Sequence, residues 1–182
     1  MVELHKHIDY RKRFIGYYIR QHYKTILDLS AGIGMFPEYY RWLGLDVTAT
    51  ENDPDKLSAL KSAGFKTRKV DLDIKKLLPF KDNQFDICTC TEVIEHIKNP
   101  KAIVQEMLRV AKCLAVITTP VGKSYSSPDH IHHWETKKEL AESGLGHIPY
   151  PSQIDEIITK LADENTSQRS FVVAIFKEEQ KQ

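Results

Sequence analysis

The chain has 182 residues, of which 41% are hydrophobic and 28% are charged, and its net charge is +1. This length and composition predict one globular domain with a full-sized core, and they exclude a polycation, so nucleic-acid binding would need a local basic patch. No stretch of about 20 apolar residues occurs, which excludes a transmembrane helix. The charged N-terminus predicts no signal peptide, and three cysteines give no disulfide framework, so we expect a cytoplasmic protein.

Strand and helix patterns alternate along most of the chain. The predicted strands are 25–29, 46–51, 65–72, 85–91, 114–119 and 170–176. The predicted helices are 10–21, 36–44, 54–64, 100–111, 137–143 and 153–162. Such alternation predicts right-handed crossovers and a mostly parallel sheet covered by helices on both faces. Ligands of such sheets bind at the carboxyl ends of the strands, so we expect the site in the loops after the first four strands.

The first strand runs into a glycine loop that reads ILDLSAGIG and leads to a helix N-terminus. Backbone N–H groups at such a place bind anionic groups, and glycines permit close approach. Glu51 ends the second strand 19 positions after Gly32, where a carboxylate accepts ribose hydroxyls in dinucleotide folds. The pattern therefore predicts a nucleotide-type ligand.

Asp28, near the end of the first strand, narrows the class of ligand. A dinucleotide enzyme prefers GxGxxG, whereas this loop reads GIGMFP, with Pro37 in place of the last glycine. The Asp28 carboxylate would repel a pyrophosphate but suits an ammonium or sulfonium group. S-adenosylmethionine has both cations and no phosphate. A nicotinamide-dependent oxidoreductase is the alternative from another class.

These motifs resemble the class I S-adenosylmethionine-dependent methyltransferases, particularly the small ones with an EVLEH-like segment, over residues 24–120. The resemblance implies a Rossmann-like sheet of seven strands, or slightly fewer, with the last strand antiparallel. The sixth strand is expected near 146–150. We expect a single domain over 1–182, with a helical lid at 1–23, a cofactor-binding core at 24–120 and a substrate-side region at 121–182.

The resemblance also implies the residues that hold S-adenosylmethionine. The glycine loop, with Ser30 in place of the first of three glycines, matches the segment that holds the methionine part. Glu51 matches the acidic residue that takes the ribose hydroxyls, and Asp71-Leu72 matches the pair beside the adenine. In the fourth strand and the turn that follows it, Thr91 and Glu92 would border the cofactor. The implied cofactor-binding set is Asp28, Ser30, Gly32, Gly34, Glu51, Asn52, Asp71, Leu72, Thr91 and Glu92.

Methyl transfer depends mainly on alignment of the reacting atoms, with a base needed only where the acceptor must lose a proton early. Candidate groups follow the fourth strand, in EVIEH, and the fifth strand, in SPDHIHHW. We predict His96 and His130 as catalytic residues, either as base or as substrate contact. The structural alternative is that EVIEH forms a helix-capping turn, in which His96 hydrogen-bonds to the backbone.

The segments Glu92-x-x-Glu95-His96 and DHIHHW also resemble the metal-dependent 2′-O-methyltransferases that act on small-RNA ends. In that family a Glu, a Glu, a His and a later His bind a divalent metal, and here His130 would supply the fourth ligand. EVLEH-like turns also occur in methyltransferases without a metal. Our main hypothesis therefore has no resident metal, and a metal-assisted RNA 2′-O-methyltransferase is an alternative.

The N-terminal segment 5–24 interleaves basic and aromatic residues. This pattern suits RNA, because cations meet phosphates and aromatics stack on bases, but it is also typical of an amphipathic helix that covers a cleft. The near-zero net charge favours the second interpretation, so we expect a small-molecule acceptor and no membrane. A catalytically silent methyltransferase-fold subunit is a further alternative. Neither the acceptor nor the oligomeric state follows from the motifs.

Overall fold

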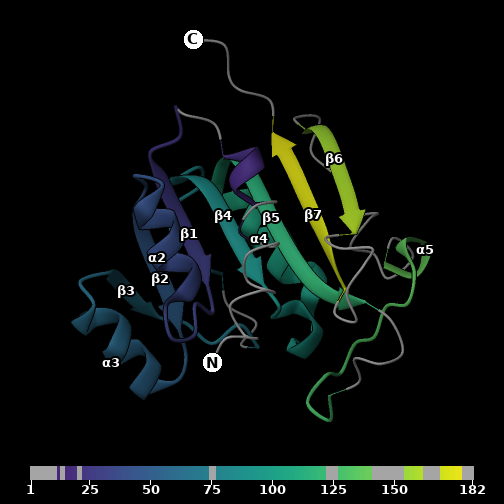
Figure 1. Cartoon of the computed structure of the whole chain (residues 1–182), viewed down its shortest axis with the longest axis horizontal. Helices are drawn as coiled ribbons and strands as arrows, with labels where there is room; N and C mark the ends of the chain where they lie inside the picture. Colours follow the sequence, from purple (N-terminus) through teal and green to yellow (C-terminus); the bar gives the residue numbers. More distant parts are fainter. Residues whose placement is uncertain are drawn as a thin grey trace.

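The computed structural model describes residues 12, 15–19, 22–73, 77–121, 127–140, 154–161 and 169–177. They form a sheet of seven strands in the order β3-β2-β1-β4-β5-β7-β6, with helices packed on it (Figure 1). The strands are β1 (Thr25–Leu29), β2 (Asp46–Glu51), β3 (Lys66–Lys69), β4 (Phe85–Thr91), β5 (Ala111–Val121), β6 (Ile154–Leu161) and β7 (Arg169–Lys177). The helical elements are α2 (Met35–Trp42), α3 (Pro54–Ser62), η1 (Ile94–His96), α4 (Pro100–Val110) and α5 (Lys137–Leu140). Residues 15–18 are also helical.

Neighbouring strands from β3 to β5 pair in parallel. β7 lies between β5 and β6 and pairs antiparallel with both. The prediction of a Rossmann-like α/β fold with a mostly parallel sheet is thereby confirmed. None of the helices in the described part of the chain is long and apolar enough to cross a membrane.

Helices cover both faces of the sheet because alternate side chains of each strand point to opposite sides. On one face, Ile26 of β1 belongs to a core cluster with Tyr40 of α2 and Leu60 of α3. On the other face, Leu27 belongs to a cluster with Met107 of α4. Figure 1 shows α2 and α4 on opposite sides of the central strands.

The two longest described helices begin with side-chain caps. The Asp53 carboxylate accepts hydrogen bonds from the first backbone N–H groups of α3, those of Asp55 (2.9 Å) and Lys56 (3.0 Å). The Asn99 side chain accepts one from Ala102 N (3.2 Å) at the start of α4. The helix predicted to begin at residue 100 is therefore found in the structure, with Pro100 at the first helical position.

The predicted helix at 153–162 is wrong, because this segment forms strand β6. Its apolar residues Ile154, Ile157, Ile158 and Leu161 have helical spacing, but their β-branched content also fits a strand. Antiparallel pairing with β7, including the pair of Ile157 and Ile175, decides between the two. The strand predicted near 146–150 and half of the residues of the helix predicted at 10–21 lie outside the described residues, and residues 12 and 15–18 of that helix are helical.

The amino ends of β1 and β4 are joined through the Asp86 carboxylate. One oxygen, Oδ2, accepts hydrogen bonds from Lys24 N (2.8 Å), Thr25 N (2.9 Å) and Thr25 Oγ1 (3.1 Å). Partial burial raises the pKa of Asp86, but these hydrogen bonds outweigh it and hold the pKa below its usual value. This contact therefore lies at the amino ends of the parallel strands, away from the carboxyl ends where the ligand is expected.

Candidate active site

The glycine loop connects β1 to α2 at the carboxyl end of the sheet. Ser30 has φ 52°, a left-handed conformation that costs a non-glycine residue about 1 kcal/mol. Gly34 has φ 94°, a backbone conformation in which an L side chain is strained, and a Cβ on it would approach Leu60 Cδ2 to 3.0 Å. The replacement of glycine by Ser30 thus introduces backbone strain at the predicted methionine-binding loop.

Glu51 ties this loop to the end of β2. Its Oε2 accepts a hydrogen bond from Gly32 N (2.8 Å), and its Oε1 accepts from Asn52 N (2.8 Å) and Asp53 N (3.1 Å). Ala31 N also donates to the backbone oxygen of Thr50 (2.8 Å). The structure therefore brings three predicted residues, Gly32, Glu51 and Asn52, into one hydrogen-bonded group with the carboxylate at its centre.

Asp28 lies beneath the loop and is only 1% exposed. Its Oδ1 accepts a short hydrogen bond from Thr89 Oγ1 of β4 (2.6 Å), whereas its Oδ2 has no hydrogen-bond partner among the described residues. Burial raises the pKa of Asp28 to about 7; the Thr89 hydrogen bond opposes this shift and the nearby charge of Glu51 adds to it. A buried carboxylate oxygen without a partner fits a cationic group of a ligand.

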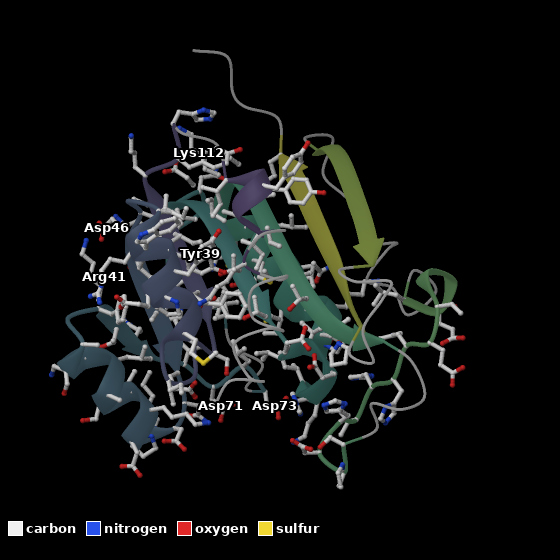
Figure 2. The ribbon with its side chains drawn as sticks, viewed as in Figure 1. Tyr39, Arg41, Asp46, Asp71, Asp73 and Lys112 are labelled. Atoms are coloured by element: carbon white, nitrogen blue, oxygen red, sulfur yellow. The ribbon has the colours of Figure 1, made fainter. Side chains whose placement is uncertain are left out.

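The predicted adenine-side residues follow β3. Asp71 Oδ1 accepts a hydrogen bond from Asp73 N (3.0 Å), and Asp73 Oδ1 accepts one from Lys98 N (2.9 Å). Leu72 is half-buried against the core cluster beneath α4. Figure 2 shows Asp71 and Asp73 at the lower edge of the sheet, where the parallel strands end. The loop after β3 is thereby tied to the segment that follows η1.

Thr91 and Glu92 lie where β4 ends, next to the end of β1. Glu92 has φ 54°, so it is in the left-handed region, as are two other described non-glycine residues, Ser30 and Asn83, of which Asn83 lies in the turn before β4. Its N–H donates to the backbone oxygen of Thr118 (2.9 Å) and is within 3.1 Å of Thr118 Oγ1. Backbone strain of this kind is concentrated at functional sites, and here it occurs at the ends of the two adjacent central strands.

The two predicted catalytic histidines lie together. The His96 and His130 rings are 4.7 Å apart between centroids and meet edge to face. His96 Nδ1 is 3.0 Å from the backbone oxygen of Asp129, and because a carbonyl only accepts, we assign the proton of the neutral ring to Nδ1. Nε2 then carries a lone pair and lies 3.8 Å from Glu95 Oε1.

Glu95 joins the loops after β4 and β5. It is only 1% exposed, and its Oε2 accepts a hydrogen bond from Thr119 Oγ1 (3.1 Å). Its backbone oxygen accepts from Ile131 N (2.9 Å) and His132 N (3.1 Å). One ligand atom each from Glu95, His96 and His130 lie within 4.8 Å of one another, an arrangement that could hold a metal ion. Glu92, the remaining residue of the metal hypothesis, is not part of this group.

The sequence motifs missed two residues of the site. Thr89 lies opposite Asp28 in the β1–β4 register, so correct strand pairing would have indicated it. Tyr40 of α2 is fully buried, and its hydroxyl has no hydrogen-bond partner among the described residues. Burial raises the pKa of Tyr40 well above its usual value, and the charge of nearby Asp28 adds to the shift. Nothing in the apolar spacing of α2 distinguishes this tyrosine from an ordinary core residue.

Most of the N-terminal segment lies outside the described residues. Within the described part, Ile15 and Tyr18 belong to the core cluster on the α2 face of the sheet, whereas Tyr17 is 81% exposed. Lys12 Nζ lies 5.6 Å from the centre of the Tyr39 ring of α2, a cation–π contact. These contacts place one turn of the segment against the sheet.

Comparison with known proteins agrees with this geometry. Residues 27–116 match the family model described as "Methyltransferase domain". A demethylmenaquinone methyltransferase from Renibacterium salmoninarum is 38% identical over 93 residues, which is 49% of this chain and 37% of the relative. A ubiquinone biosynthesis O-methyltransferase from Idiomarina loihiensis is 28% identical over 132 residues, covering 69% of this chain and 51% of the relative. The matches thus span about a third to a half of each relative's length.

Solved structures share the fold. The crystal structure of a SAM-dependent methyltransferase from Methanosarcina mazei has a TM-score of 0.67 and 17% identity, and the match covers 91% of this chain and 97% of that one. The fold, the loop geometry and the family match lead to one class. Residues 27–116 belong to the methyltransferase domain family, and the chain has the fold of the class I S-adenosylmethionine-dependent methyltransferases. S-adenosylmethionine is the cofactor of that class.

Proposed function

We propose that this chain transfers a methyl group from S-adenosylmethionine to an oxygen or nitrogen atom of a small-molecule acceptor. The observation that carries the proposal is the buried Asp28 carboxylate, with one oxygen unpartnered among the described residues, beneath a glycine loop that Glu51 holds in place. The names of the two relatives, which refer to demethylmenaquinone and to ubiquinone biosynthesis, favour a small-molecule acceptor.

The proposed cofactor contacts divide among the loops at the carboxyl end of the sheet. The loop with Ser30, Gly32 and Gly34 holds the methionine part, and Asp28 faces its cations. Glu51 and Asn52 take the ribose hydroxyls. The remaining proposed contacts are Asp71 and Leu72 at the adenine, and Thr91 and Glu92 beside the reacting end. When bound, the cofactor supplies a methyl group activated by its sulfonium sulfur.

Acceptor chemistry belongs, in this proposal, to His96 and His130. The unprotonated Nε2 of His96 suits removal of a proton from an acceptor hydroxyl or amine, since the Asp129 carbonyl holds the ring in the required tautomer. His130 lies beside it and orients the acceptor. We also propose a single domain over 1–182, in which residues 1–23 form a lid over the acceptor site.

Binding tests separate this proposal from an oxidoreductase of the same sheet type. We expect the protein to bind S-adenosylhomocysteine in calorimetry and to show no binding of NAD under the same conditions. A screen with a radiolabelled methyl donor should then transfer label to a component of a small-metabolite extract. Binding of NAD but not of S-adenosylhomocysteine would overturn the proposal. Label transfer that occurs only after a second protein is added would instead support the silent-subunit alternative.

A second candidate function is a metal-assisted RNA 2′-O-methyltransferase. The observation that favours it is the convergence of Glu95, His96 and His130, in which the carbonyl contact of His96 Nδ1 resembles the outer-shell support of metal-bound histidines. We expect turnover in the main proposal to survive a chelator. Loss of turnover in chelator, its restoration by Mn²⁺ or Mg²⁺, and label transfer to total RNA would favour this second function. His130→Ala, with His133→Ala as the matched control, would locate the metal.

A further inference from the structure

Three buried polar side chains meet beneath the glycine loop. Asp28 of β1 and Thr89 of β4 are opposite one another in the strand register, and their side chains are joined by the 2.6 Å hydrogen bond. Tyr40 reaches the same region from α2, close enough for the Asp28 charge to raise its pKa after burial, the larger cause. None of the three is more than 1% exposed. Such a group is far from water, so its protonation depends on its protein neighbours.

The electrostatic surroundings of Asp28 disfavour a charged carboxylate in the ligand-free protein. Glu51 of β2 adds a second negative charge, while the Tyr40 hydroxyl and the thiols of Cys88 and Cys90 are neutral neighbours whose pKa values burial raises. The two thiols belong to the core cluster on the opposite face of the sheet, whereas the cluster that contains Tyr40 also holds the titratable residues Tyr18, Tyr23 and Cys113, with Tyr39 packed against it. Among the described residues, no lysine or arginine forms an ion pair with Asp28.

We propose that Thr89 is a positioning residue that, through its hydrogen bond to Asp28, sets the pH range in which a proton leaves the site as the cationic cofactor binds. This inference rests on the proposed use of S-adenosylmethionine. The ligand-free site holds a proton on Asp28 near neutral pH, because burial raises the pKa of this group to about 7. An ammonium or sulfonium group favours the carboxylate form, so binding releases that proton to solvent. The Thr89 hydroxyl donates to the carboxylate and therefore favours its ionised form.

Affinity should then depend on pH in a defined way. Below the pKa of Asp28, binding must displace a proton, so the dissociation constant of S-adenosylhomocysteine, which retains the ammonium group, should fall about tenfold for each unit of rising pH. Above that pKa the affinity should level off. The number of protons released should be close to one at low pH and should fall toward zero at high pH. Calorimetry from pH 5.5 to 9, in two buffers of different ionisation enthalpy, measures both quantities.

Two variants isolate Thr89. Thr89→Val removes the hydroxyl and keeps the shape of the side chain. The pH above which the affinity becomes constant should therefore rise by about one unit, and near neutral pH binding should weaken by roughly tenfold. Thr89→Ser keeps the hydroxyl and should retain the wild-type profile. Thermal unfolding in the absence of ligand verifies that both variants are folded. If Thr89→Val is unfolded, the proton release measured on the wild-type protein still tests whether ligand binding is coupled to loss of a proton.

The outcomes distinguish this inference from the proposed function. If the wild-type protein binds S-adenosylhomocysteine with the same affinity at every pH, or releases no proton, the coupling is wrong and the proposed function stands. If folded Thr89→Val has the wild-type profile, Thr89 has no positioning role. If no S-adenosylhomocysteine binds at any pH, it is the proposed function that fails. A shifted profile in Thr89→Val with a wild-type profile in Thr89→Ser supports the inference.

Discussion

Replacing Asp28 with asparagine is expected to stabilise the ligand-free protein at pH 8 while abolishing cofactor binding. Burial raises the pKa of Asp28 from 3.8 to about 7, so the folded protein holds a proton that the unfolded chain has already lost in this interval. The stability contribution of Asp28 therefore falls as pH rises from about 4 to about 7 and is constant above that. Asparagine does not titrate, so the free energy of unfolding of Asp28→Asn relative to the wild-type protein should rise by roughly 3 kcal/mol between pH 5 and pH 8.

Denaturant unfolding of both proteins at the two pH values measures this difference. Asp53 and Asp86, whose pKa values are lowered, contribute with the opposite sign, but they are present in both proteins and cancel in the comparison. Asp46→Asn is a suitable control, because Asp46 is exposed at the amino end of β2, far from the site in Figure 2. If the free energy of unfolding changes by the same amount between pH 5 and pH 8 in Asp28→Asn as in the wild-type protein, the burial argument is wrong.

Replacing Glu51 with glutamine should weaken S-adenosylhomocysteine binding by roughly 10- to 100-fold, the loss expected for a charge-assisted hydrogen bond. The two carboxylate oxygens accept hydrogen bonds from three backbone N–H groups, those of Gly32, Asn52 and Asp53. An amide has only one oxygen, so its NH₂ group must face at least one of these donors. The glycine loop would then lose its attachment to β2 even though the side chain has nearly the same size.

Calorimetry and thermal unfolding together test this expectation. Glu38→Gln provides the matched control, since Glu38 is an exposed glutamate on α2 whose ion pair with Arg41 lies on the surface and contributes little to stability. If both the affinity and the thermal stability of Glu51→Gln are unchanged, the carboxylate neither holds the loop nor contacts the ligand. A loss of stability without a loss of affinity would limit Glu51 to a structural role.

The positions of the first five strands and the starts of the helices α3 and α4 were predictable because each depends on local sequence. Asn99-Pro100 and Asp53-Pro54 give start signals that the structure retains. The assignment of 153–162 failed because the four apolar residues have helical spacing, whereas three of them are β-branched isoleucines that also fit a strand. The choice depends on β7, which follows later in the chain and pairs with this segment. Pairing across long sequence distances is invisible to a local window.

The candidate site divides in the same way. The proximity of His96 and His130 followed from placing both after adjacent parallel strands, and the structure brings their rings together. The contact between Thr89 and Asp28 required the exact register of β1 and β4, which periodicity alone does not give. The place of the Tyr40 side chain near Asp28 depends on the rotation of α2 about its axis, which the sequence does not give. The roles of all these residues in binding and catalysis remain predictions.

The Asp86 contact at the amino ends of β1 and β4 bears on how this protein can acquire new acceptors. It joins the two central strands at their amino ends, where no ligand contact is proposed. The loop 127–134 lies near the carboxyl ends of the parallel strands, so substitutions in it leave the Asp86 contact intact. Loops on a rigid scaffold also tolerate sequence change. Under the proposed function, substitutions in this loop change the acceptor specificity while the strands beneath the cofactor loop keep their alignment.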